Sequence, residues 1–90
     1  MEFEWDPDKG IRNLVKHGVA FTDAATVFGD PLATTFADPD HADYEDRFVT
    51  FGRSTAGQLL IVAHTDREDR TRIISARRAS RGERKIYEQG

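Results

Sequence analysis

Near its carboxyl end the chain reads Arg70-Thr-Arg-Ile-Ile-Ser-Ala-Arg-Arg-Ala-Ser-Arg-Gly-Glu-Arg-Lys-Ile-Tyr87, and this stretch predicts two structural elements. Residues 71–77 favour a strand, because they contain adjacent β-branched residues and follow a polar turn. Ser80 and Glu83 have the spacing of a capping box, which predicts a short helix over residues 81–88. The fold can be worked out from this strand and helix towards the amino terminus.

The same stretch concentrates positive charge. Its single acid, Glu83, stands among seven basic residues: Arg70, Arg72, Arg77, Arg78, Arg81, Arg84 and Lys85. The whole chain has a net charge of −3, which divides into 3 − 11 = −8 for residues 1–46 and 10 − 5 = +5 for residues 47–90. Such a cluster suits an anion such as RNA phosphate. A solvated basic face, or a docking site for an acidic partner, explains the charge equally well.

Upstream of this stretch the pattern predicts a meander of strands. Residues 47–53 and 58–65 flank a compact turn, and residues 66–69 form a second turn before the strand over 71–77. If that second turn centres on Glu68, His64 lies opposite Arg72 on one face of the sheet.

The amino-terminal half predicts a short strand and then two helices. Residues 3–5 read as the strand, and Asp6 and Gly18 bound a helix over residues 7–17 as its amino-terminal and carboxyl-terminal caps. The helical spacing predicts one apolar face turned to the core, formed by Ile11, Leu14 and Val15. It also predicts a separate polar, basic face, formed by Lys9, Arg12, Asn13 and Lys16.

A second helix is expected from Thr22 to before Gly29, with four apolar positions: Ala24, Ala25, Val27 and Phe28. Residues 32–36 read as a strand. The acidic loop at residues 38–46 has enough carboxylates for a hard cation, but it lacks the spacing of a calcium loop, so a solvated loop is favoured.

The element order β-α-α-β-β-β-β-α predicts an α+β fold. We expect an antiparallel sheet of about four strands, with two amino-terminal helices and a short carboxyl-terminal helix, in one domain over residues 1–90. The chain has no cysteine, which excludes disulfides and thiolate metal sites. An acidic amino terminus and the lack of a long apolar segment argue against a signal peptide or a membrane partner, so a soluble, cytoplasmic protein is expected.

The residues near the predicted helix could cut RNA without a metal ion or cofactor. Such cleavage needs a base for the 2′-hydroxyl, cations for the charge at phosphorus and an acid for the leaving oxygen. The candidates are His64 or Glu83 as base or acid, Arg72, Arg77 and Arg84 as phosphate clamps, and Tyr87 as a further proton donor. Structural roles compete: Glu83 as a cap, Tyr87 as a core residue, and His17 as a partner of a helix end. The three histidines, His17, His41 and His64, lack the spacing of a metal site.

Three blocks of sequence resemble the BrnT toxin family. The first is Trp5-Asp6-Pro7-x-Lys9-x-x-x-Asn13-x-x-Lys16-His17-Gly18-Val19-x-Phe21, followed by Ala24-x-x-Val27-Phe28. The second comprises Glu45-x-Arg47 and Gly52. The third is Arg72-Ile-Ile-Ser-Ala-Arg77-x-Ala79-x-x-x-Glu83-Arg84-x-x-Tyr87. They cover nearly the whole chain in the family's order, although Gly82 stands where relatives often have a longer residue.

The resemblance implies the toxin of a type II toxin–antitoxin system, a small ribonuclease with a RelE-like fold. It also implies a DNA-binding antitoxin, BrnA, that represses the shared operon and forms a complex with two copies of each protein. Operator DNA would then be bound only through the antitoxin. The matching positions place the functional cluster at His64, Arg72, Arg77, Glu83, Arg84 and Tyr87. With the basic residues nearby, RNA contacts are expected at Lys9, Lys16, His17, Arg81 and Lys85. The rival interpretation is a non-catalytic module that binds an acidic protein or nucleic acid.

Overall fold

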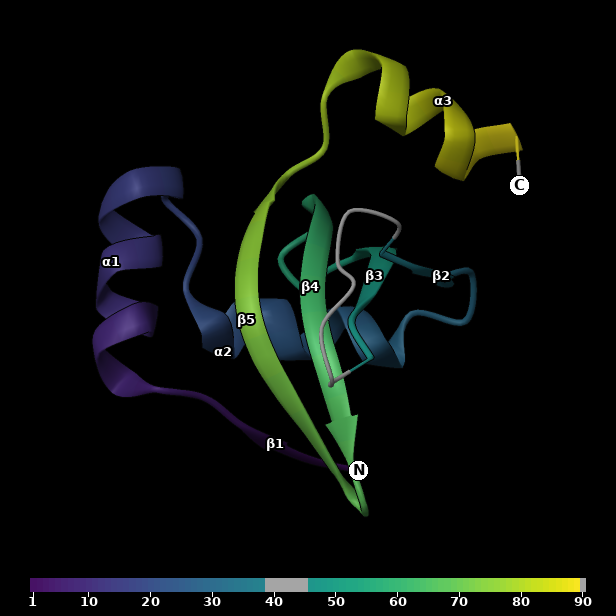
Figure 1. Cartoon of the computed structure of the whole chain (residues 1–90). Coiled ribbons are helices and arrows are strands. Elements are labelled where there is room, and N and C mark those ends of the chain that lie inside the picture. The colour runs from purple at the N-terminus through teal and green to yellow at the C-terminus, as the bar shows by residue number, and fades with distance from the viewer. Residues whose placement is uncertain (39–45, 90) are drawn as a thin grey trace.

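The computed structural model describes residues 1–38 and 46–89, which form three α-helices, one 3₁₀ helix and five strands. In chain order these are β1 (Glu2–Glu4), α1 (Pro7–His17), α2 (Phe21–Thr26), η1 (Val27–Gly29), β2 (Thr34–Ala37), β3 (Phe48–Arg53), β4 (Leu59–Arg67), β5 (Arg70–Arg78) and α3 (Arg81–Gln89). Figure 1 shows β4 and β5 as a long central hairpin, with α3 beyond the end of β5. Among the described residues, no helix has the length and apolar character needed to cross a membrane.

The strands form one mixed sheet in the order β1-β5-β4-β3-β2. β1 runs parallel to β5, and the other neighbouring strands are antiparallel. The predicted α+β class is therefore confirmed. The observed sheet differs from the expected antiparallel sheet of about four strands by one additional edge strand, β1, which is parallel to its neighbour. A parallel pair needs a long crossover connection, and α1 and α2 begin the segment that supplies it.

A β-bulge in the β4–β5 hairpin changes the predicted register. Glu68 and Asp69 form a two-residue turn that the Arg67–Arg70 pair closes. Further from the turn, the register shifts between Ala63 and His64. The resulting pairs are His64 with Ile73, Thr65 with Arg72, Ala63 with Ser75, Val62 with Ala76 and Ile61 with Arg77. The predicted pairing of His64 with Arg72 is wrong, because the turn is centred between residues 68 and 69 and not on Glu68. Ile74 is the extra residue of the bulge in β5.

The hydrophobic core lies between one face of the sheet and α2 with η1. It consists of Val19, Phe21, Ala24, Val27, Leu60, Val62, Ile73 and Ala76. Two of the apolar positions predicted for the second helix, Ala24 and Val27, are fully buried in this core. β3 approaches η1 so closely that a Cβ atom at Gly52 would lie 2.6 Å from Cγ1 of Val27. Only glycine permits this approach.

The bounds predicted for α1 are confirmed, but the prediction of which face of the helix is buried is wrong. Asp6 caps the helix by accepting a hydrogen bond from the Asp8 amide at 2.9 Å, and Gly18 ends it with φ 71°. The apolar positions are nevertheless exposed, with Ile11 at 63%, Leu14 at 51% and Val15 at 83%. The side chain that α1 buries is Asn13, which the helical spacing places on the polar, basic face.

Asn13 is buried because it completes the edge of β5. β1 pairs with residues 70–72, and within the described ranges, 1–38 and 46–89, no strand pairs with the later part of β5 on that side. The Asn13 side chain accepts a hydrogen bond from the Ala76 amide at 3.1 Å and donates to the Ala76 and Val19 carbonyls at 2.8 Å each. Buried backbone groups require such partners, and here they draw the polar side of the helix onto the sheet.

α3 rests only lightly on the rest of the molecule. None of its residues is buried, and Ile86 is 52% exposed. The capping box is confirmed: Glu83 accepts a hydrogen bond from the Ser80 amide at 2.8 Å, and the Ser80 hydroxyl accepts one from the Glu83 amide at 3.3 Å. Two side chains of α3, Glu83 and Tyr87, make the polar contacts described below with the rest of the chain.

Candidate functional site

Arg77, the penultimate residue of β5, forms a two-point ion pair with Glu83 in the first turn of α3. The Arg77 guanidinium donates two hydrogen bonds to the Glu83 carboxylate, each 2.8 Å long. The same carboxylate accepts the Ser80 amide of the capping box. Glu83 therefore anchors the start of α3 and holds the fork of Arg77 in one orientation.

This ion pair also controls the protonation of its members. The hydrogen bonds from Arg77, supported by those from Ser80, lower the pKa of Glu83 to about 2, and Glu83 in turn raises the pKa of Arg77. At neutral pH Glu83 is thus a carboxylate of low basicity while it remains paired. An anion that occupied the Arg77 fork would release Glu83 and make it a stronger base.

Tyr87 belongs to a second contact between α3 and the body of the molecule. Its hydroxyl donates to Asp30 at 2.6 Å, and the same carboxylate oxygen accepts the Arg53 amide at 2.7 Å. The Arg53 guanidinium lies 5.7 Å from the centre of the Tyr87 ring. The bond to Asp30 raises the pKa of Tyr87 and lowers that of Asp30. Asp30 and Arg53 were not among the residues predicted for the site, and no sequence signal connected either of them to Tyr87.

His64 lies on the opposite face of the sheet from Arg77, and only 2% of the residue is exposed. Its ring packs edge-on against Phe28 at 4.9 Å and stacks with Phe48 at 5.9 Å. Nε2 is 2.7 Å from the Thr50 hydroxyl, and Nδ1 is 3.2 Å from Asp66. Burial lowers the pKa of His64, which favours the neutral ring. The structure does not bring His64 to the arginine cluster.

Arg72 shares the outer face of the sheet, the face opposite α2, with Arg77, but it lies far along it. Their partners on β4, Thr65 and Ile61, are four residues apart, or roughly 14 Å at about 3.4 Å per residue. Arg72 donates to Glu4 at 2.9 Å across the β1–β5 pair. This contact lowers the pKa of Glu4. Arg72 therefore lies outside the Arg77–Glu83 site.

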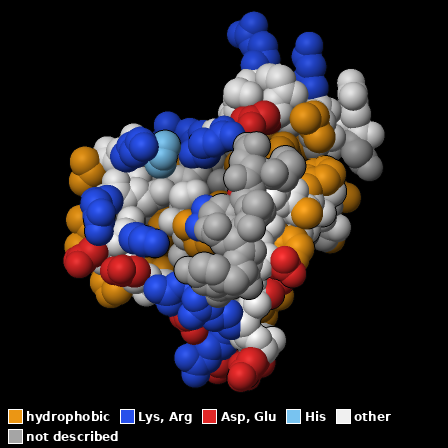
Figure 2. Space-filling view, in the orientation of Figure 1, with side chains coloured by type: hydrophobic (Ala, Val, Ile, Leu, Met, Phe, Trp, Pro, Cys, Tyr) orange, Lys and Arg blue, Asp and Glu red, His pale blue; other side chains and the backbone are white. Residues whose placement is uncertain are grey.

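The basic side of α1 lines a groove beside β5. Lys9, Arg12, Lys16 and His17 enclose about 270 Å³ there, together with Asn13 and residues 74–75. Figure 2 shows lysine and arginine side chains spread over this helix, across the adjoining part of the sheet and onto α3. The structure thus brings Lys9, Lys16 and His17, which are predicted to contact RNA, to one groove.

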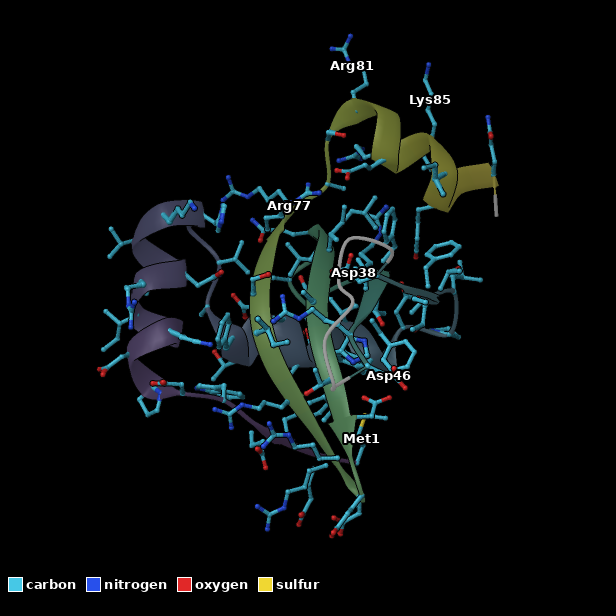
Figure 3. The ribbon with its side chains drawn as sticks, viewed as in Figure 1. Met1, Asp38, Asp46, Arg77, Arg81 and Lys85 are labelled. Carbon is cyan, nitrogen blue, oxygen red and sulfur yellow. The ribbon has the colours of Figure 1, made fainter. Side chains whose placement is uncertain are left out.

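The basic residues of α3 are placed differently. In Figure 3, Arg77 lies at the junction of β5 and α3, whereas Arg81 and Lys85 project away from the sheet. Arg84 is also exposed. Arg81 and Lys85 extend the basic surface beyond the Arg77–Glu83 pair and do not converge on it.

The described residues contain no group of three or more acidic, histidine or cysteine side chains arranged to hold a metal ion. Most of the acidic loop considered for a cation, residues 39–45, lies outside the part of the chain that the structure describes.

Comparisons with known proteins agree on one family. The model of the family described as "Ribonuclease toxin, BrnT, of type II toxin-antitoxin system" matches residues 5–83. The crystal structure of the Brucella abortus ribonuclease toxin BrnT is similar, with a TM-score of 0.66 and 25% identity over 90% of this chain and 99% of that chain. No match was found among curated proteins. Because the family match takes in most of the chain, including Arg77 and Glu83, the chain belongs to the BrnT family of ribonuclease toxins of type II toxin–antitoxin systems.

Proposed function

We propose that residues 1–90 form one toxin domain that cuts RNA without a metal ion, at a site built from Arg77, Glu83, Arg84 and Tyr87. The two-point Arg77–Glu83 pair carries this proposal. It places a guanidinium that fits two phosphate oxygens next to a carboxylate that can take a proton. The groove of cations on α1 supports the proposal by offering a second region for the RNA backbone.

In the proposed reaction an RNA phosphate takes the place of Glu83 on Arg77. The freed Glu83 accepts the proton of the adjacent 2′-hydroxyl, and the 2′-oxygen attacks phosphorus. Arg77 stabilises the charge that develops on the phosphate oxygens, since its donors are held in place before the reaction begins. The bond to the 5′-oxygen then breaks, which leaves a 2′,3′-cyclic phosphate and a 5′-hydroxyl.

Tyr87 is the proposed proton donor to the leaving 5′-oxygen. Its raised pKa keeps the phenol protonated at neutral pH, and its hydroxyl has to turn away from Asp30 to reach the substrate. Arg84, exposed in the same helix, is assigned to the flanking phosphate. His64 remains a core residue in this proposal, and Arg72 contacts RNA outside the reacting bond.

The test is to incubate the purified protein with RNA in EDTA. We expect cleavage with cyclic-phosphate ends by the wild type, and a loss of at least about 100-fold in rate for Arg77→Ala and Glu83→Gln. The matched control is Arg70→Ala, which removes another exposed arginine paired with glutamates, at 3.5 Å from Glu2 and Glu4. This control should cleave like the wild type.

Three results would count against the proposal. Full activity of both the Arg77→Ala and Glu83→Gln variants would show that the site is misplaced. Activity that EDTA removes and Mg²⁺ restores would show a metal mechanism. Saturable, salt-dependent RNA binding without products would favour the non-catalytic module instead.

We further propose that the toxin cuts mRNA in the cytoplasm and thereby arrests translation, until a DNA-binding antitoxin covers the basic surface. A toxin of a type II system has an antitoxin partner, and the expected complex has two copies of each chain. Co-purification with the product of the adjacent reading frame, followed by measurement of the mass in solution, tests this composition. Operator DNA should bind the complex and not the toxin alone.

A further inference from the structure

A largely apolar cleft lies beside Arg77, between α3 and the outer face of the sheet. Its volume is about 450 Å³, within the range of small-ligand sites. Its lining includes Phe36, Phe51, Ile61, Arg77, Glu83 and Ile86. The two members of the candidate catalytic pair therefore form part of its wall.

Two aromatic rings provide a surface for stacking in this cleft. Phe36 and Phe51 contact each other edge to face, with their centres 5.6 Å apart and their planes at 75°. Phe36 is 46% exposed, although it is a large apolar side chain. An accessible ring on a sheet is the surface on which proteins stack the bases of single-stranded nucleic acid.

The strand order places this aromatic pair within reach of a nucleotide bound at Arg77. Arg77 pairs with Ile61, and Ile61 pairs with Phe51 on the next strand. Two strand spacings separate β5 from β3, which carries Phe51, and three separate it from β2, which carries Phe36, or about 10 Å and about 14 Å. The guanidinium and both rings line the same cleft, so a phosphate on Arg77 and a base on Phe36 belong to one short segment of RNA.

We propose that this cleft is a nucleobase subsite, in which one unpaired base of the RNA stacks on Phe36 while a neighbouring phosphate is bound by Arg77. The subsite rests on the proposed ribonuclease function and adds a residue that selects unpaired RNA. An apolar peptide would use only the apolar area of the cleft, whereas a nucleotide uses the ring face and the adjoining guanidinium together.

The test is binding of short fluorescent RNA oligonucleotides, methylated at every 2′-hydroxyl so that they cannot be cut. One oligonucleotide is intact, and each of the others lacks the base at one position. Phe36→Leu keeps an apolar side chain of similar size but removes the ring. It should weaken binding of the intact RNA roughly 5- to 150-fold, the range expected for one stacked base. Phe36→Tyr, which keeps a ring, should bind like the wild type.

The decisive result is the coupling between the Phe36→Leu substitution in the protein and the removal of one base from the RNA. For the oligonucleotide that lacks the stacked base, Phe36→Leu should change the affinity less than about twofold. The matched control is Leu32→Ala, an exposed apolar residue just before β2 that does not line the cleft. It should leave the affinity for every oligonucleotide unchanged.

Equal losses for intact and base-lacking RNA, or no loss for either, would overturn the subsite. So would a loss of antitoxin affinity alone, which would identify the cleft as a protein-docking groove. Failure of the two proposals can be told apart. Arg77-dependent cleavage without coupling at Phe36 removes only the subsite, whereas coupling without cleavage of unmodified RNA removes only the proposed reaction.

Discussion

At the residue scale, the Asn13 side chain supplies the hydrogen bonds that a neighbouring strand would make with the backbone of β5 at Ala76. Asn13→Ala removes three buried hydrogen bonds and leaves the Ala76 amide, the Ala76 carbonyl and the Val19 carbonyl without their partner. We expect the free energy of unfolding to fall by about 2–4 kcal/mol, because each unpaired buried group costs about 1–3 kcal/mol and the site relaxes in part. Urea unfolding measures the change. Arg12→Ala, at the neighbouring exposed position, should change stability by less than about 0.5 kcal/mol, and a loss this small for Asn13→Ala would contradict the assignment.

Also at the residue scale, the Arg77–Glu83 pair makes stability depend on acid pH. The pKa of Glu83 is about 2 in the folded protein against an ordinary value of 4.5. A lowered carboxyl pKa contributes stability that is complete above pH 4.5 and is lost as the pH falls towards 2. NMR titration of the Glu83 carboxyl should therefore show a midpoint well below 4.5 in the wild type and a higher one in Arg77→Ala, where the hydrogen bonds from Ser80 still hold it below 4.5. Equal midpoints in the two proteins would show that the pair does not form in solution.

At the scale of elements, the weak point is Gly82 in the first turn of α3. A Cβ atom added there would meet nothing within 4 Å, and α3 has no buried residue to hold it in place. Gly82→Ala should raise the helicity of α3 and stabilise the protein by up to about 1 kcal/mol, because alanine loses less backbone entropy in a helix. Circular dichroism and amide exchange within α3 measure the change.

Gly57 provides the matched control for this prediction. A Cβ atom there also meets open space, but φ is +86°, which favours glycine. Gly57→Ala should therefore destabilise the protein by about 1 kcal/mol. If both substitutions had the same sign, backbone conformation would not be the deciding factor.

At the scale of the whole molecule, the distribution of charge matters more than the net charge of −3. Lysine and arginine side chains gather over α1, the adjoining sheet and α3 (Figure 2), so RNA should bind this surface despite the overall negative charge. Lys9→Gln with Lys16→Gln should weaken binding of all single-stranded sequences alike. It should also reduce the slope of log K against log salt by about 1.4, at about 0.7 per phosphate contact. An unchanged slope would place the RNA elsewhere.

Local chemistry in the sequence was enough to predict several elements. The caps at Asp6, Gly18 and Ser80 depend on neighbours within a few residues, and all three predictions are confirmed. The face of α1 could not be predicted in this way. Its apolar spacing indicated a core at Ile11 and its neighbours, but the unpaired edge of β5 required Asn13 instead. That requirement exists only once the short β1 has left part of β5 uncovered.

The sequence by itself determined the class of fold, the charge asymmetry and the family, because blocks such as Lys16-His17-Gly18 and Ile73-Ile74-Ser75-Ala76-Arg77 are local and ordered along the chain. The tertiary structure alone decided which residues meet. The bulge at Ile74 lets Ile73 and Ala76 both pair with core-facing residues of β4, His64 and Val62, and it leaves Arg77 on the outer face beside Glu83. Side chains alternate between the faces of a sheet, so a shift of one residue in register exchanges the residues that face the core with those that face the candidate site. No local pattern specifies that shift, because it is set by strand pairing between distant residues.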